Sequence, residues 1–194
     1  MAKLYYRFSS MNAGKSTALM QIAYNYEERD QRVVVVKPST DTKDINVLSR
    51  LGVKRSVDIH LAPKDNLFKL VEEDIKQNGK IDCVLIDEAQ FLTRDQVNQA
   101  FTIAVSSGIP VIAYGIRTDF QTNAFPGSAR LLEISHSLEE LKTICRCGRK
   151  AILNGRKVNG RFIKKGSQVA IDGDRVEYES LCGFCYVEKV GPIV

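Results

Sequence analysis

Three groups of residues have types and spacings that could do chemistry, and the first lies close to the N-terminus. Gly14-Lys15-Ser16 matches the end of the phosphate-binding pattern Gly-x4-Gly-Lys-Ser/Thr, shortly after an apolar run. Backbone amides in such a turn can hold phosphate oxygens, the lysine can bridge the outer phosphates, and the serine hydroxyl can bind Mg²⁺. Ser9 stands where the pattern has its first glycine. We predict that ATP is bound by the segment Ser9, Ser10, Met11, Asn12, Ala13, Gly14, Lys15, Ser16 and Thr17.

The second group is a pair of neighbouring carboxylates. The apolar run Val84-Leu85-Ile86 ends in Asp87-Glu88. Ligands of open α/β sheets bind beyond the carboxyl ends of the strands, so Asp87 is expected to face the same cleft as Ser16. One carboxylate can support Mg²⁺ while the other polarises a nucleophile, which is water in an ATPase and a substrate hydroxyl in a kinase. A solvated acidic strand end is the alternative without chemistry.

Four of the five cysteines form the third group, as Cys145-x-Cys147 and Cys182-x₂-Cys185. Four thiolates make a closed tetrahedral Zn²⁺ site, which is structural rather than catalytic. Two disulfides or four plain thiols are the alternatives, but the start of the chain lacks the features of a secretory signal, which favours metal. Cys83 is expected to be a small buried residue.

The elements that must position these groups follow from the apolar periodicity. Short apolar runs predict strands at 4–8, 33–36, 81–86 and 109–114, and helical patterns lie between them. This alternation is typical of a parallel α/β sheet. We expect helices after the phosphate loop, after a cap at Asp65, and from Thr93 onward.

The remaining segments are irregular. The polar stretches 38–54 and 115–128 predict loops, and the Gly-rich, basic sequence from Cys145 onward predicts small hairpins. These changes of character divide the chain into a nucleotide-binding core, 1–143, and a small metal-binding domain, 144–194.

Composition sets broad limits on the class of protein. Hydrophobic residues make up 44% and charged residues 26%, as in globular proteins. No run approaches the ~20 apolar residues that span a bilayer, so a cytoplasmic protein without a membrane partner is expected. The net charge of +5 is mild, although Lys142 to Lys165 contains nine basic residues and no acidic one. That stretch predicts either a solvated face or phosphate contacts.

Four motifs in this order resemble the type II thymidine kinases over nearly the whole chain. They are the loop Ser9–Thr17, the strand end Asp87-Glu88-Ala89-Gln90-Phe91, the segment Tyr114–Phe120 and the paired cysteines. The resemblance implies a P-loop, RecA-like parallel sheet core with a small zinc-ribbon-like lasso domain, assembled as a homotetramer. It implies transfer of the γ-phosphate of ATP, with Mg²⁺, to the 5′-hydroxyl of thymidine, which gives dTMP for nucleotide salvage and DNA synthesis.

The resemblance also implies roles for single residues. Glu88 matches the general base, Asp87 matches the acid that supports Mg²⁺, and Gln90 belongs to the same ATP-binding strand end. The matching residues of the thymidine pocket are Met11, Phe91, Phe120, Phe125 and Tyr178. Met11 matches a residue near the 5-methyl group of the base, and Tyr178 matches a tyrosine of the lasso loop that closes over the nucleoside. The zinc ligands Cys145, Cys147, Cys182 and Cys185 would anchor both ends of that loop.

Some alternatives stay open at this point. Asp41-Thr42-Lys43 stands where the family usually has an acidic residue and an arginine, and lysine lacks the planar fork of arginine. Thymine and uracil differ by one methyl group, worth about 1–3 kcal/mol in a pocket, so deoxyuridine is a second candidate substrate. An ATP-dependent nucleic-acid-binding P-loop ATPase with a zinc ribbon is the alternative function, and a nucleotide-binding regulator without catalysis is a third. The kinase needs no nucleic-acid partner.

Overall fold

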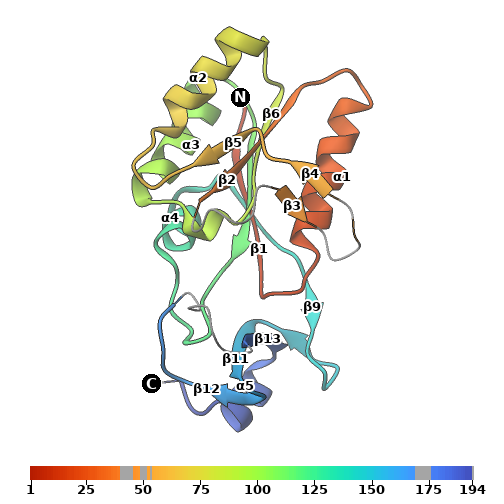
Figure 1. Cartoon of the computed structure of the whole chain (residues 1–194), viewed down its shortest axis with the longest axis vertical. Helices are drawn as coiled ribbons and strands as arrows, with labels where there is room; N and C mark the ends of the chain where they lie inside the picture. Colours follow the sequence, from red (N-terminus) through yellow and green to blue (C-terminus); the bar gives the residue numbers. More distant parts are fainter. Residues whose placement is uncertain (40–45, 49–51, 53, 169–175, 194) are drawn as a thin grey trace.

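The computed structural model describes residues 1–39, 46–48, 52, 54–168 and 176–193. A six-stranded parallel sheet forms its centre, with the strand order β5-β2-β6-β7-β1-β8 (Figure 1). The predicted parallel α/β sheet is confirmed, and the four predicted strands lie in its interior. The two short edge strands, β5 and β8, were not predicted. The bounds are β1 Leu4–Ser9, β2 Val33–Pro38, β5 Ile59–Leu61, β6 Cys83–Ile86, β7 Val111–Ile116 and β8 Ser137–Glu140.

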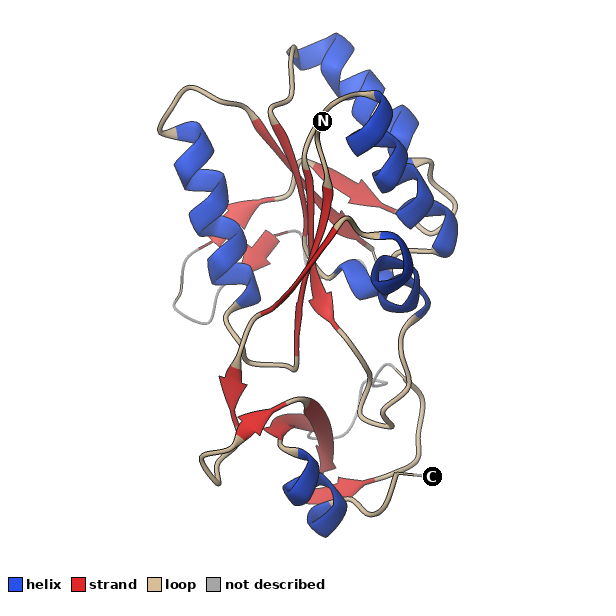
Figure 2. Cartoon of the chain, turned by 180° about the vertical axis from the view of Figure 1, so that it is seen from behind, coloured by secondary structure: helices blue, strands red, loops and turns tan. Residues whose placement is uncertain are grey.

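Helices cover both faces of this sheet. Helix α1 (Lys15–Glu27) covers one face, whereas α2 (Leu67–Asn78), α3 (Arg94–Ser106) and α4 (Pro126–Ile134) cover the other (Figures 1 and 2). Successive residues of β2 face opposite ways, so Val33 and Val35 pack in the α1 layer and Val34 and Val36 in the other. All four valines are buried. Burial on both faces explains the unbroken apolar runs from which the strands were predicted.

Capping residues decide where two of the helices begin. The Thr93 hydroxyl accepts a hydrogen bond from the Gln96 N–H and completes a capping box at the start of α3. The expected cap of α2 at Asp65 is wrong by one residue. Asn66 caps α2 by accepting from the Lys69 N–H, because the Asp65 carboxylate is engaged in the preceding turn by the Ala62 N–H at 2.8 Å.

Both predicted loops hold regular structure. Within 38–54, β3 (Asn46–Leu48) pairs antiparallel with β4 (Lys54–Ser56) and buries Val47 in the α1 layer. Asp41 and Lys43 lie outside the described residues. The loop predicted over 115–128 is shorter than expected, because β7 runs to Ile116 and α4 begins at Pro126. Proline is well suited to the first turn of a helix.

Small sheets lie beyond the carboxyl ends of the core strands, at the bottom of Figure 1. The expected hairpins are present there, and a short helix that was not predicted follows them. The division at residue 143 stays a prediction. The elements are β9 Thr143–Ile144, β10 Lys150–Ala151, β11 Leu153–Val158, β12 Arg161–Ile163, β13 Val176–Leu181 and α5 Gly183–Lys189. Among the described helices, none combines the length and the apolar character that crossing a membrane requires.

Candidate active site

The phosphate loop connects the end of β1 at Ser9 to the start of α1 at Lys15. Gly14 caps the helix with a φ of 75°, a left-handed conformation that glycine adopts without steric cost. The Lys15 ammonium group donates to the Ser9 hydroxyl at 3.0 Å and to the Ser10 carbonyl at 3.2 Å. The hydroxyl that replaces the first glycine of the pattern is therefore a partner of the phosphate-loop lysine.

The start of α1 is suited to an anion. Its first turn carries no acidic residue, and the N–H groups and dipole of a helix N-terminus favour negative charge. Lys15 adds a positive charge at the same end. The charge and the helix end that suit this turn to an anion are therefore both local features of the sequence.

Asp87 follows β6 directly and is almost fully buried, with 4% of its surface exposed. Burial first, and the neighbouring Glu88 second, raise the pKa of Asp87 to about 7, while Lys37 and Lys15 act in the opposite direction. Strands β1 and β6 both run parallel to β7, so the phosphate loop and this strand end lie at one edge of the sheet. A cation beside Asp87 would favour its ionised form.

Glu88 comes next and has a left-handed backbone, with a φ of 49°. The Gln90 side-chain amide donates to the Glu88 carboxylate at 2.5 Å, and its oxygen accepts from the Ile116 N–H at 3.2 Å. Gln90 is 2% exposed and lies in the short 3₁₀ turn η1 (Ala89–Phe91). A side chain at Gly115 would lie 2.9 Å from the Gln90 oxygen, so this close approach needs glycine. Gln90, predicted to bind ATP, is thus placed between Glu88 and β7.

The predicted aromatic residues form two separate contacts. Phe91 meets Phe125 edge to face, with ring centres 5.5 Å apart. Phe120 is buried beneath the guanidinium of Arg156, 3.9 Å from the ring centre. Arg156 also donates from Nε to the Tyr178 hydroxyl at 2.8 Å, which links Phe120 to Tyr178. Tyr178 lies in strand β13 and not in a loop.

Arg156 is a residue that the sequence analysis missed. It is 3% exposed, and its two terminal nitrogens donate to the carbonyls of Ser167 and Gln168 at 2.6 and 2.7 Å. Nothing in the alternating, basic sequence around it distinguishes a buried arginine from an exposed one. Asn154 and Ser180, which contact the phosphate loop, were missed for the same reason.

The four paired cysteines come together as expected. Their sulfur atoms all lie within 4.8 Å of one another, and all but Cys147 are buried. The thiols are free rather than joined in disulfides. The Cys185 N–H lies 3.4 Å from the Cys182 sulfur and, as the largest cause, lowers the pKa of the Cys182 thiol. Four thiols converging on one point, with an amide directed at sulfur, fit a tetrahedral ion.

The basic stretch Lys142 to Lys165 is only in part an open surface. Lys157 pairs with the carboxylate of Glu179 at 2.5 Å, Lys150 pairs with Glu140, and Arg156 is buried. These interactions remove positive charges from any continuous basic face. They weaken the case for a nucleic-acid interface.

Comparison with known proteins identifies the family of the chain. The family model described as "Thymidine kinase" matches residues 2–186. The thymidine kinase of Rhodopirellula baltica is 46% identical over 193 residues, covering 98% of this chain and 90% of that protein. That of Idiomarina loihiensis is 47% identical over 194 residues, covering 98% and 99%. Among solved structures, the Legionella pneumophila ATPase DotB aligns over 77% of this chain and 43% of its own, at 16% identity and a TM-score of 0.42, too distant to bear on function. The full-length matches show that the chain belongs to the thymidine kinase family.

Proposed function

We propose that this chain transfers the γ-phosphate of ATP to the 5′-hydroxyl of thymidine, giving dTMP and ADP. The observation that carries the proposal is the meeting of two groups at one sheet edge. The anion-binding turn at Lys15 follows β1 and the carboxylates Asp87 and Glu88 follow β6; both strands run parallel to β7, so both groups lie at the carboxyl edge of the sheet. Membership of the thymidine kinase family selects a nucleoside hydroxyl over water as the nucleophile.

Different residues of the chain have different roles in phosphoryl transfer. The amides at the start of α1 and the Lys15 ammonium bind the phosphates and oppose the charge that spreads over the transferred group. Glu88 is the general base that accepts the proton of the 5′-hydroxyl. The donor from Gln90 fixes one oxygen of Glu88, which leaves the other oxygen for the substrate.

Mg²⁺ would be held by the Ser16 hydroxyl and Asp87. A buried carboxylate whose pKa is raised to about 7 is a group that a divalent cation would stabilise in its ionised form. When bound, the ion supplies positive charge to the β- and γ-phosphate oxygens.

The thymidine pocket is assigned to Met11, Phe91, Phe120, Phe125 and Tyr178. Phe91 and Phe125 form an edge-to-face pair, and aromatic rings are suited to contact with a pyrimidine ring. Phe120 is buried beneath Arg156, so it would bound the pocket only where that cover is displaced. Arg156 lies between Phe120 and Tyr178 and fixes the positions of both side chains. Deoxyuridine stays a candidate second substrate.

The four cysteines are proposed to hold a structural Zn²⁺. The ion would join the β9–β10 turn to the end of β13 and the start of α5, and so would stabilise a small domain, 144–194, whose apolar core is modest. A homotetramer and a cytoplasmic location are proposed from the resemblance alone.

The test is an ADP-release assay with ATP and Mg²⁺, run in parallel with thymidine, deoxyuridine, deoxycytidine, no acceptor and single-stranded DNA. We expect strong stimulation by thymidine and none by DNA. Equal turnover without an acceptor, or stimulation by DNA, would support the ATPase instead. Metal analysis of the same preparation should give one zinc per chain in wild type and less in Cys182→Ser, with Cys83→Ser as the matched cysteine control.

A further inference from the structure

The middle of the phosphate loop is attached to the cysteine-bearing part of the molecule. The Met11 N–H donates to Oδ1 of Asn154 at 2.7 Å, and the Ser180 hydroxyl donates to the Met11 carbonyl. Asn154 and Ser180 are direct cross-strand partners on β11 and β13. We propose that these two side chains, the Met11 bracket, hold the phosphate loop in its nucleotide-binding shape. They act as positioning residues for ATP, and this inference rests on the proposed role of the loop.

Both members of the Met11 bracket are removed from solvent. Asn154 is 2% exposed and Ser180 is 7% exposed. Loss of either side chain would leave a polar backbone group of the half-buried Met11 without its protein partner. The loop would then be free to shift toward other partners, including water.

The Asn154 amide has a fixed orientation. Its Nδ2 donates to the Thr118 carbonyl at 2.9 Å, so Oδ1 must face the Met11 N–H. Thr118 follows strand β7, which is the neighbour of β1 in the sheet. Asn154 therefore connects the loops that leave two adjacent core strands, and it ties both to β11.

The phosphate loop has reason to need external support. Asn12, the residue after Met11, has a φ of 62°, a left-handed conformation that non-glycine residues adopt only when their surroundings impose it. The bracket also occupies the Met11 N–H, so the amides left to bind phosphate come from the rest of the loop. A loop held in the bound shape loses less freedom on binding, which increases affinity.

The experiment measures binding of ADP with Mg²⁺ by titration calorimetry, using the full-length, zinc-replete chain without nucleoside. Ser180→Ala and Asn154→Ala are each expected to weaken ADP binding by about five- to tenfold, as for the loss of one buried hydrogen bond. Ser180→Thr keeps the hydroxyl and is expected to retain affinity. The double variant should lose less than the product of the two single effects, because both act through Met11.

Thr93→Ala is the matched control. The Thr93 hydroxyl accepts from the Gln96 N–H at 3.2 Å and completes the capping box of α3, on the opposite face of the sheet from α1. It should lower the melting temperature and leave ADP affinity unchanged. Zinc content is measured in every variant, so that metal loss is not mistaken for loop movement.

The outcomes separate this inference from the proposed function. Unchanged ADP affinity in Ser180→Ala and Asn154→Ala, at wild-type zinc content, would overturn the bracket and leave the kinase proposal standing. Equal weakening in Thr93→Ala would also overturn it, because lost stability alone would then explain the effect. A wild-type chain that does not bind ADP would contradict the proposed function itself.

Discussion

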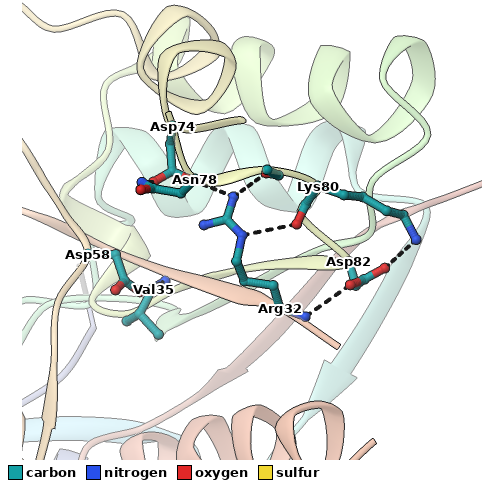
Figure 3. Close-up of polar contacts among 8 residues, drawn as sticks. Arg32, Val35, Asp58, Asp74, Asn78, Lys80 and Asp82 are labelled. Atoms are coloured by element: carbon teal, nitrogen blue, oxygen red, sulfur yellow. Dashed lines mark hydrogen bonds and ion pairs between the residues drawn. The ribbon is translucent and has the colours of Figure 1, made fainter. Parts of the chain in front are cut away.

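Charged side chains are arranged differently at the two ends of the central sheet. At the amino end, Arg32 precedes β2 and Asp82 precedes β6, and opposite charges meet (Figure 3). Arg32 pairs with Asp74 at 2.7 Å, and Lys80 pairs with Asp82 at 2.5 Å. At the carboxyl end, Asp87 and Glu88 place two carboxylates side by side, and Asp87 is buried.

The pKa values of two aspartates express this difference. Hydrogen bonds from Lys80 and from the Arg32 backbone lower the pKa of Asp82. Burial and Glu88 raise the pKa of Asp87 to about 7. The charged groups at the amino end are thus paired with one another within the fold. At the carboxyl end, the buried Asp87 carboxylate would be stabilised in its ionised form by a positively charged ligand. This contrast supports the carboxyl end as the place of the proposed chemistry.

The largest expected effect is that of Glu88→Gln. We expect kcat to fall by ~10²–10⁴-fold, as is typical for loss of a general base, with ATP and thymidine affinities nearly unchanged. Steady-state kinetics and equilibrium binding check this. Glu133→Gln, an exposed glutamate on α4 that pairs with Arg94 and Arg130, is the control and should retain full kcat. A Glu88→Gln enzyme with normal kcat would exclude Glu88 as the base.

Asp87→Asn should stabilise the ligand-free protein while it impairs catalysis. Because the folded pKa of about 7 exceeds the ordinary value of 3.8, the unfolded chain ionises first, and stability falls as pH rises between these values. We expect a gain on the order of 1–3 kcal/mol near pH 8 that shrinks toward about pH 4. Thermal unfolding across this pH range measures it. A gain independent of pH would show that the Asp87 carboxylate does not carry this cost.

Arg32→Met should destabilise the fold without affecting the reaction. Arg32 donates to the Gly79 and Lys80 carbonyls at 2.6 and 3.0 Å in addition to its ion pair with Asp74. Its partial exposure limits the expected loss to about 1–2 kcal/mol. Urea unfolding measures the loss, and kcat/KM should match wild type. A large fall in kcat/KM would mean that the two ends of the sheet are coupled.

Asp82→Asn should give the smallest effect, with the opposite sign to Asp87→Asn. Its lowered folded pKa contributes stability above the ordinary pKa, and this contribution disappears as pH falls through the folded value. Since Lys80 is exposed and solvent screens the pair, the loss at neutral pH should stay below about 1 kcal/mol. Unfolding at low and high salt checks it. A stabilising effect at neutral pH would remove the contrast between Asp82 and Asp87.

Sequence reasoning located the interior of the fold better than its edges. The interior strands β2, β6 and β7 are buried on both faces and read as continuous apolar runs, as in Val33–Val36. Edge strand β5 alternates one exposed residue with two buried ones over only three positions, and β8 is largely open to solvent. Elements that short give no reliable periodic signal. The caps show the same limit, since Asp65 and Asn66 are both good capping residues and the turn chooses between them.

The sequence by itself determined the groups whose chemistry depends on near neighbours. The turn at Gly14-Lys15-Ser16, the strand end at Asp87-Glu88 and the cysteine pairs are each encoded within a few residues, because local backbone geometry places their atoms. Only the tertiary structure decided which distant groups serve them. Asn154 contacts Met11 across 143 positions of the chain, and Arg156 joins Phe120 to Tyr178. Such contacts depend on how separate elements pack, and the sequence around a polar side chain does not reveal which distant residue it will contact.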